Sequence, residues 1–219
     1  MFKEVVTIKE YHKNGTLFFK EKRAESFIKK QELEWFIKNV PDNVVILSDE
    51  AYVEYVEADD FGSASQWIGK ENVIIARTFS KVYGLAGLRI GYGIASADII
   101  GIMEKIRPPF NTSSLAQDAA IAALDDTDFV KKSIYYNKKE RIYLFENLKR
   151  MGFTVFQSEA NFLFCRTEKN TTEICEKLEE NGVIVRPVDG FDSTGNYIRI
   201  TIGKPSENRF LIKQLKKIC

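Results

Sequence analysis

From residue 26 onward, short apolar runs alternate with amphipathic segments, and this alternation constrains the fold more than any other feature. The first helix candidate is residues 29–40 (KKQELEWFIKNV), which place apolar side chains at helical spacing and end at Pro41-Asp42. The strand candidates are residues 43–48 (NVVILS), 72–77 (NVIIAR) and 89–95 (RIGYGIA). The run at 43–48 is continuously apolar, as in a strand that is buried on both faces of a parallel sheet. The pattern predicts an α/β domain.

The rest of the chain predicts a bridging helix and a second, smaller domain. Helices are expected at residues 98–106, 113–124 and 128–151, with Ser113 or Ser114 as the N-cap of the second. The elements that follow are a strand at 161–166, a helix at 171–181, strands at 183–187 and 197–202, and a helix at 206–218. This order predicts a small two-layer α+β domain. We therefore divide the chain into residues 26–125 and 126–219.

Residues 1–25 read differently from the rest. The segments EVVTIKEYHK and TLFFKEKR flank Asn14-Gly15, a strong signal for a hairpin turn. We expect this segment to be a hairpin separate from the α/β domain.

Composition excludes several classes of function. With 32 basic and 31 acidic residues the net charge is +1, which gives no electrostatic footprint for nucleic acid or an anionic membrane. The apolar runs are too short to span a bilayer, and the N-terminus has no signal-peptide core. The three cysteines (Cys165, Cys175 and Cys219) are scattered, and His12 is the single histidine. We expect a cytoplasmic protein without a disulfide framework or a bound metal.

Polar residues follow two of the expected strands. Asp49 directly follows the strand at 43–48, and Tyr52 lies three residues further on. Lys81 follows the strand at 72–77. Ligands of open α/β sheets bind at the carboxyl ends of the strands, so these side chains are expected to share one site.

The residue types at this edge suit Schiff-base chemistry with pyridoxal 5′-phosphate (PLP). A lysine in an apolar, cation-rich setting becomes a nucleophile. Arg89 and Ser80 could hold a phosphate, the arginine through its bidentate fork and the serine through its hydroxyl. A carboxylate such as Asp49 could keep a pyridinium nitrogen protonated, which lets PLP act as an electron sink.

Each of these residues also has an ordinary structural interpretation. A lone lysine in a loop is usually solvated, and Asp49 could cap a following helix. The acidic run DEAYVEYVEADD could be a solvated turn or a divalent-metal site. The glycines of GLAGLRIGYG could mark turns and close packing. The GYG within that segment lies in a strand rather than at the start of a helix, so it is not a dinucleotide-binding motif.

Taken together, the motifs resemble a known family. DEAYVEY followed by RTFSKVYGLAGLRIGYG is similar to the class I/II, fold-type I PLP-dependent aminotransferases. RPPFNTSSLAQDAAIAAL, ANFLFCR, GVIVRPVDGF and YIRITIG, in that order, are similar to the histidinol-phosphate subfamily. The resemblance extends from about residue 26 to the C-terminus and implies a partial PLP-binding large domain followed by the small domain.

The resemblance implies a role for each residue at the strand ends. Lys81 would bind the cofactor covalently and then shuttle the proton. Asp49 would pair with the pyridinium nitrogen, and Tyr52 would bond the phenolic oxygen. Ser80 and Arg89 would hold the phosphate.

Three residues of the smaller domain would face the substrate. Arg199 would bind the α-carboxylate of glutamate or the phosphate of histidinol phosphate, and Arg186 would contribute to anion binding. Asn161 would line the substrate side. An exposed arginine on a strand is also common without any function, so these assignments rest on the motifs.

The sequence departs from the family before residue 26. Family members are longer at the N-terminus, where they carry the phosphate-binding turn, the aromatic residue that stacks on the cofactor and an NPxNPTG motif. At the place of that motif this chain reads KNGTLFFKEKRAESF. The hypothesis is a truncated or split gene product. The family also implies a homodimer that shares a tyrosine between its subunits.

The function that the resemblance implies is transamination between L-histidinol phosphate with 2-oxoglutarate and imidazole acetol phosphate with glutamate, in histidine biosynthesis. One alternative is another class I/II aminotransferase or a threonine-phosphate-type decarboxylase. A second is a non-catalytic aminotransferase fragment, and a third is a plain α/β binding module.

Overall fold

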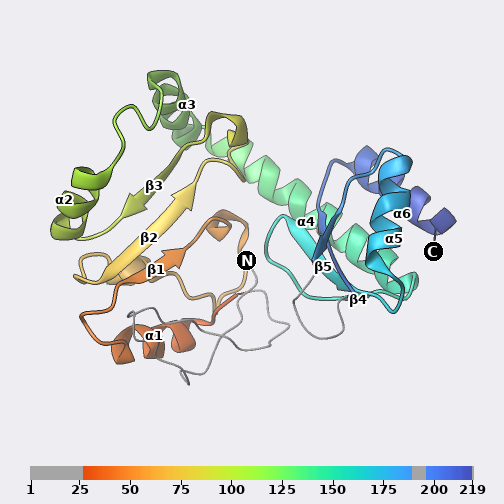
Figure 1. The fold of residues 1–219 in the computed structure, drawn as a ribbon, viewed down its shortest axis with the longest axis horizontal. Coiled ribbons are helices and arrows are strands. Elements are labelled where there is room, and N and C mark those ends of the chain that lie inside the picture. Colours follow the sequence, from red (N-terminus) through yellow and green to blue (C-terminus); the bar gives the residue numbers. More distant parts are fainter. Residues whose placement is uncertain (1–26, 189–195, 219) are drawn as a thin grey trace. The chain divides into compact units, whose positions relative to one another are not determined.

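The computed structural model describes residues 27–188 and 196–218 (Figure 1). These residues form two compact units, the first comprising residues 27–131 and the second residues 132–188 and 196–218. The hairpin predicted around Asn14-Gly15 lies outside the described residues. No helix within the described ranges is long and apolar enough to cross a membrane.

The first unit contains a three-stranded sheet in the order β1 (Ile46–Asp49), β2 (Val73–Thr78) and β3 (Gly91–Ile94). β1 runs parallel to β2, and β3 runs antiparallel to β2 (Figure 1). The predicted strands are present with shifted bounds, and β1 includes Asp49. β3 begins only at Gly91 because Arg89 has left-handed backbone angles (φ 52°, ψ 46°), which an extended strand excludes.

One face of this sheet packs on α1 (Lys30–Asn39), whose Leu33 and Ile37 join Ile46, Val73 and Ile75 in a buried cluster. Leu47 of β1 points away from that cluster and is 63% exposed, and Val45, which directly precedes β1, is 60% exposed. The prediction that residues 43–48 are buried on both faces is therefore wrong. Strand side chains alternate between faces, and within the described residues the helix covers one face.

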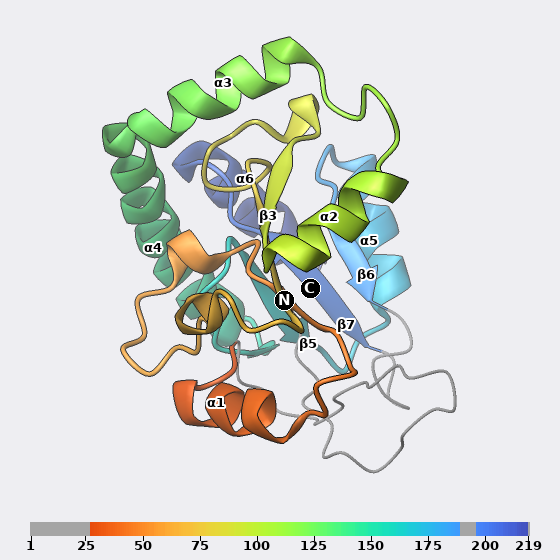
Figure 2. The same ribbon diagram turned by 90° about the vertical axis from the view of Figure 1, so that its left-hand side faces the viewer.

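Helices and short turns follow the strands of the first unit. The helices are α2 (Ala97–Ile106), α3 (Ser114–Asp125) and α4 (Thr127–Arg150), which Figure 2 shows from a second side. The 3₁₀ turns are η1 (Val53–Tyr55), η2 (Ala64–Trp67) and η3 (Ala86–Leu88). The Ser113 hydroxyl accepts the Ala116 N–H, as predicted for the N-cap of α3. α3 packs Ala116 and Ala120 against Phe79 and Ile90, the residues that flank the loop carrying Lys81.

The second unit is an antiparallel sheet with helices. Its strands are β4 (Thr154–Val155), β5 (Phe162–Arg166), β6 (Arg186–Val188) and β7 (Tyr197–Thr201), and they lie in the order β4-β5-β7-β6. Its helices are the C-terminal part of α4, α5 (Thr171–Glu180) and α6 (Pro205–Ile218). β4 was not predicted because it has only two residues. β6 starts later than the predicted strand at 183–187, since Val183 N–H donates to Leu178 O (2.8 Å) and still closes the end of α5.

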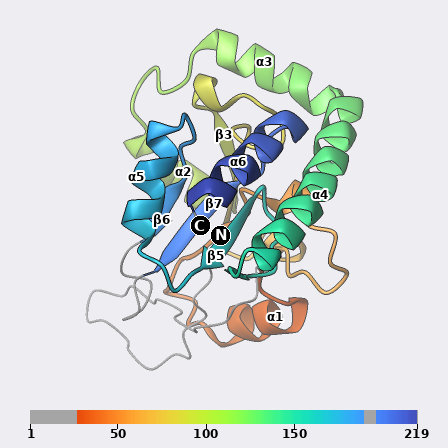
Figure 3. The same ribbon diagram turned by 90° about the vertical axis from the view of Figure 1, so that its right-hand side faces the viewer.

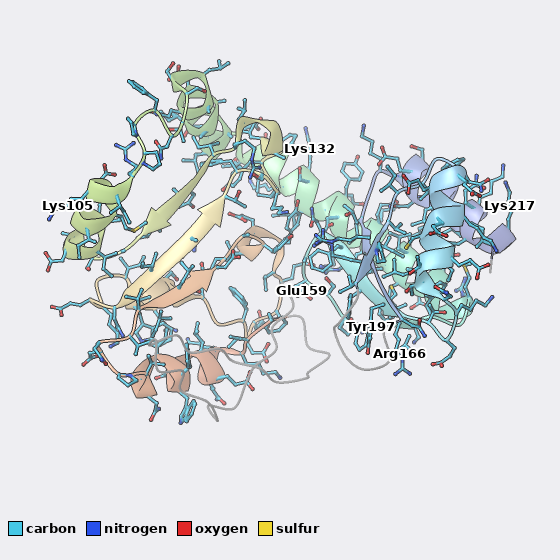
Figure 4. All side chains as sticks on the ribbon, in the orientation of Figure 1. Lys105, Lys132, Glu159, Arg166, Tyr197 and Lys217 are labelled. Carbon is cyan, nitrogen blue, oxygen red and sulfur yellow. The ribbon has the colours of Figure 1, made fainter. Side chains whose placement is uncertain are left out.

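The two faces of this sheet differ in character. Leu163, Cys165, Ile198 and Ile200 point into a buried core with the helices, which Figure 3 shows on the near side of the strands. The alternate positions, including Arg166 and Tyr197 labelled in Figure 4, occupy the opposite face. Phe164 and Tyr197 stack there with ring centroids 4.9 Å apart. Strand alternation thus separates an apolar face from one that carries aromatic and arginine side chains.

Candidate active site

Lys81 lies in a turn just after β2 that is fixed by backbone hydrogen bonds. Phe79, which is buried, donates its N–H to Ile90 O (3.2 Å) and accepts from Leu85 N–H (2.9 Å). The Gly84 N–H donates to Lys81 O (3.0 Å), and Gly84 has a positive φ of 72° that this tight turn requires. Lys81 itself is half-buried. The turn therefore holds the lysine in a defined place at the carboxyl end of β2.

The amine of Lys81 lies over an aromatic ring. Its Nζ is 5.0 Å from the centroid of the Tyr52 ring. No carboxylate of the described residues forms an ion pair with this amine. The structure thus brings together Lys81 and Tyr52, as the sequence predicted, although they come from the ends of different strands.

Ser80 and Arg89 converge beside the lysine. Arg89 Nη1 donates to Ser80 Oγ (3.4 Å) and to Ala86 O (3.0 Å). Ser80 N–H in turn donates to Thr78 Oγ1 (3.0 Å), a contact that no sequence pattern indicated. Arg89 is exposed at the end of η3 with a left-handed backbone, which costs a residue with a Cβ about 1–2 kcal/mol. A guanidinium and a hydroxyl at one place are suited to an anion.

Asp49 ends β1 at the same edge of the sheet. It is paired in register with Ala76 of β2, and its side chain is exposed. Its Oδ1 accepts the Ala51 N–H (3.1 Å), which organises the turn that leads to Tyr52. The carboxylate is therefore held by a local turn at the edge where Lys81 follows β2.

Sequence reasoning missed the residue next to Asp49. Glu50 is only 4% exposed, and its carboxylate accepts hydrogen bonds from Arg77 Nη2 (2.8 Å) and Nε (3.2 Å). It also accepts the Ala64 N–H (2.7 Å) and the Ser63 hydroxyl (3.0 Å). The sequence signal that could have revealed this contact is Arg77, an arginine inside an otherwise apolar strand. A charged side chain that is buried needs a partner of opposite charge.

The expected substrate residues belong to the second unit. Arg186 of β6 and Arg199 of β7 are paired in register, so they share one face of the sheet. The Arg199 guanidinium lies 5.1 Å from the centroid of the Phe162 ring, a contact that the sequence did not indicate. Asn161 directly precedes β5, and its carbonyl accepts the Ile202 N–H (2.9 Å).

No group of three or more histidine, cysteine, aspartate or glutamate side chains within the described parts of the chain could hold a metal ion.

The fold and these side chains agree with a family model. The model of "Aminotransferase class I and II" matches residues 26–215. The chain therefore belongs to the class I and II aminotransferase family. The match begins at residue 26, where the resemblance in the sequence also begins.

Individual relatives are histidinol-phosphate aminotransferases. The chain is 42% identical over 194 residues to the enzyme of Caldicellulosiruptor saccharolyticus, covering 88% of this chain and 54% of that protein. It is 40% identical over 195 residues to histidinol-phosphate aminotransferase 2 of Carboxydothermus hydrogenoformans, again covering 88% and 54%. The chain thus spans about half the length of the curated relatives it matches.

Solved structures have the same fold. The histidinol-phosphate aminotransferase of Sinorhizobium meliloti, solved in complex with pyridoxal-5′-phosphate, matches with a TM-score of 0.81 and 29% identity, over 89% of this chain and 55% of that one. The L-threonine-O-3-phosphate decarboxylase of Porphyromonas gingivalis matches with a TM-score of 0.75 and 25% identity, over 87% and 59%.

Proposed function

We propose that this chain carries the lysine-bearing half of a PLP-dependent aminotransferase site that acts on L-histidinol phosphate and 2-oxoglutarate. The observation that supports this most directly is the convergence of Lys81 with Tyr52, at 5.0 Å from Nζ to the ring centroid, next to the Ser80–Arg89 contact. The identity of 42% to a histidinol-phosphate aminotransferase supports the choice of substrate.

The residues present fit PLP by their chemistry. Arg89 and Ser80 supply a cation and a hydroxyl for its phosphate, and Asp49 supplies an exposed carboxylate for its ring nitrogen. Tyr52 supplies a phenol for its oxygen, and Lys81 supplies the amine for its aldehyde. PLP, when bound, serves as an electron sink for the bonds at the substrate's α-carbon.

In the proposed reaction the protein's own residues bind the reactants and move one proton. Lys81 Nζ, held at the carboxyl end of β2 over the Tyr52 ring, is the group that takes up a proton and returns it. The Asp49 carboxylate is oriented by the turn in which its Oδ1 accepts the Ala51 N–H, and a carboxylate beside a ring nitrogen favours the protonated form of that nitrogen. Arg89 orients the phosphate end, so that the reacting end is presented to Lys81.

Arg186 and Arg199 are proposed to hold the anionic ends of the substrates. Both substrates and both products carry a phosphate or a carboxylate, and an arginine fork matches either group. The proposal assigns Asn161 to the substrate side. The products are imidazole acetol phosphate and glutamate, as a step of histidine biosynthesis in the cytoplasm, and the working unit is a homodimer as in the family.

A second candidate is decarboxylation of a threonine-phosphate-type substrate. The similarity to the Porphyromonas gingivalis decarboxylase favours it, because arginines bind phosphates and carboxylates in either reaction. A non-catalytic aminotransferase fragment is a third candidate, which the turnover assays below separate from the two enzymes.

The first test is an absorbance titration of the purified chain with PLP, followed by borohydride reduction and peptide mass analysis. The variant is Lys81→Ala, and the control is Lys105→Ala, an exposed lysine of α2 labelled in Figure 4. Cofactor fixed on Lys81 in the wild type and in the control, but lost in the Lys81 variant, supports the proposal. Equal labelling of all three proteins contradicts it.

The choice of substrate is tested on the cofactor-loaded protein. Consumption of L-histidinol phosphate with 2-oxoglutarate supports transamination, and release of CO₂ from O-phospho-L-threonine supports the decarboxylase. Cofactor binding without turnover of either substrate supports the fragment.

A further inference from the structure

We infer that the buried Glu50–Arg77 ion pair is a positioning device that holds Asp49 and Lys81 at one edge of the sheet. The inference rests on the proposed function of that edge. Glu50 is buried, so we assign it no direct contact with cofactor or substrate.

The backbone places the pair beneath the site. Successive strand residues point to opposite faces, so the Glu50 side chain leaves the chain on the face opposite Asp49. Glu50 N–H donates to Ala76 O (2.9 Å) and extends the pairing of β1 with β2 by one residue beyond Asp49. Arg77 is the next residue of β2 after Ala76. The pair therefore joins the two strand ends directly behind the candidate catalytic residues.

The Glu50 carboxylate joins three segments. Arg77 belongs to β2, four residues before Lys81, and Ala64 N–H belongs to the first turn of η2. The Ser63 hydroxyl donates to both carboxylate oxygens, at 3.0 and 3.2 Å. Both oxygens of the buried carboxylate are thus satisfied by donors from outside its own strand, which fixes the strand end in place.

The charge on Arg77 is held by the same contacts. Burial acts to lower the pKa of Arg77, but hydrogen bonds to Glu50 and to Tyr92 outweigh it and the net pKa is raised. Tyr92 is the in-register partner of Arg77 on β3. The network consequently extends from β1 across β2 to β3, the three strands of the sheet in the first unit.

Loss of the pair should loosen the site more than it changes the fold elsewhere. A displacement of about 1 Å at a reacting group costs roughly 100-fold in rate. A comparable case is the residues that hydrogen-bond to the ligands of a metal ion. Their mutation weakens metal binding by roughly 10- to 100-fold. We expect a loss of PLP affinity of about that size.

The test compares Glu50→Gln with Glu140→Gln in the full chain. Glu140 is a matched control because it is 1% exposed and its carboxylate also accepts from an arginine, Arg209 Nη1 (2.9 Å), in the second unit. The readouts are the PLP dissociation constant, the yield of borohydride-fixed cofactor on Lys81, and hydrogen exchange of peptides 46–55 and 76–85. Ser63→Ala removes only the hydroxyl that donates to the Glu50 carboxylate, and it replaces Glu50→Gln in the test if that variant does not fold.

We expect Glu50→Gln to weaken PLP binding roughly 10- to 100-fold and to speed exchange in both peptides, with Glu140→Gln near wild type in all three readouts. Ser63→Ala should change them in the same direction by a smaller factor. Unchanged PLP binding in a folded Glu50→Gln protein, or an equal change in Glu140→Gln, overturns the inference.

Failure of the proposed function gives a different result. If the wild-type chain takes up no PLP, the proposed function is wrong for this chain, and exchange alone decides the inference. Faster exchange at both strand ends in Glu50→Gln then supports the positioning role, and unchanged exchange overturns it.

Discussion

Arg186 on β6 and Arg199 on β7 lie directly opposite each other in the antiparallel sheet of the second unit. Like charges at such positions are destabilising, by about 0.2–1 kcal/mol for a cross-strand pair. Arg199 also lies 5.1 Å from the ring centroid of Phe162, a contact that orients its guanidinium. Two cations held side by side are readily explained if an anion binds between them, as the proposed function requires.

Neutralising one member of this pair should raise stability and weaken anion binding. We expect Arg186→Gln to increase the free energy of unfolding by up to about 1 kcal/mol without ligand, because the repulsion is removed. Stabilisation by added L-glutamate should fall in the same variant, since a ligand stabilises only the folded protein that binds it. Urea unfolding with and without glutamate measures both effects.

Arg166→Gln is the control for that experiment, because Arg166 lies on the same face of the sheet but opposite Tyr197. It should retain the wild-type response to glutamate. A glutamate response that survives in Arg186→Gln would rule out the anion role of Arg186.

Two substitutions of Arg89 distinguish the effect of its strained, left-handed backbone from the effect of its positive charge. Arg89→Gly and Arg89→Ala both remove the contact to Ser80, but only alanine keeps the strain at φ 52°. We expect the glycine variant to be about 1 kcal/mol more stable than the alanine variant in urea unfolding. Both variants should lose the preference for PLP over pyridoxal, which lacks the phosphate. A preference that persists would place phosphate binding elsewhere.

The two glycines of β3 should respond differently to substitution. A Cβ built at Gly91 would lie 2.6 Å from Arg77 O, whereas at Gly93 its nearest contact is 3.7 Å. Gly91→Ala should therefore cost about 1–3 kcal/mol of stability, because β2 and β3 must move apart. Gly93→Ala should cost little. Thermal unfolding of the two variants tests this, and equal melting temperatures would contradict the close approach.

Alkaline pH should destabilise the protein partly through Cys165. Burial raises the pKa of this thiol from its ordinary value of 9.0 to about 12, so the folded state keeps a proton that the unfolded state loses. Stability therefore falls as pH rises above about 9 and levels off for this group near 12, at about 1.4 kcal/mol per pH unit. In Cys165→Ala the slope of unfolding free energy against pH should be smaller by that amount. An unchanged slope between wild type and variant would exclude the thiol as the cause.

Local patterns predicted most of the elements correctly. The helices α1 to α6 lie within a few residues of their expected bounds, and Ser113 caps α3 as its position indicated. These features depend on spacing along the chain, which a single sequence contains. The family was predictable for a similar reason, since the residues around Lys81 form one continuous motif.

Contacts between distant segments were beyond that reasoning. Glu50 and Arg77 are 27 residues apart, and no periodicity relates them. The sequence by itself determined the order of the helices and of every strand except β4, the family, and the types of side chain at the strand ends. Only the tertiary structure decided that Glu50 is buried against Arg77, that Arg186 faces Arg199, and that Arg89 adopts a left-handed backbone. The physical reason is that strand register and turn closure depend on which segments meet in space, and a local pattern leaves that choice open.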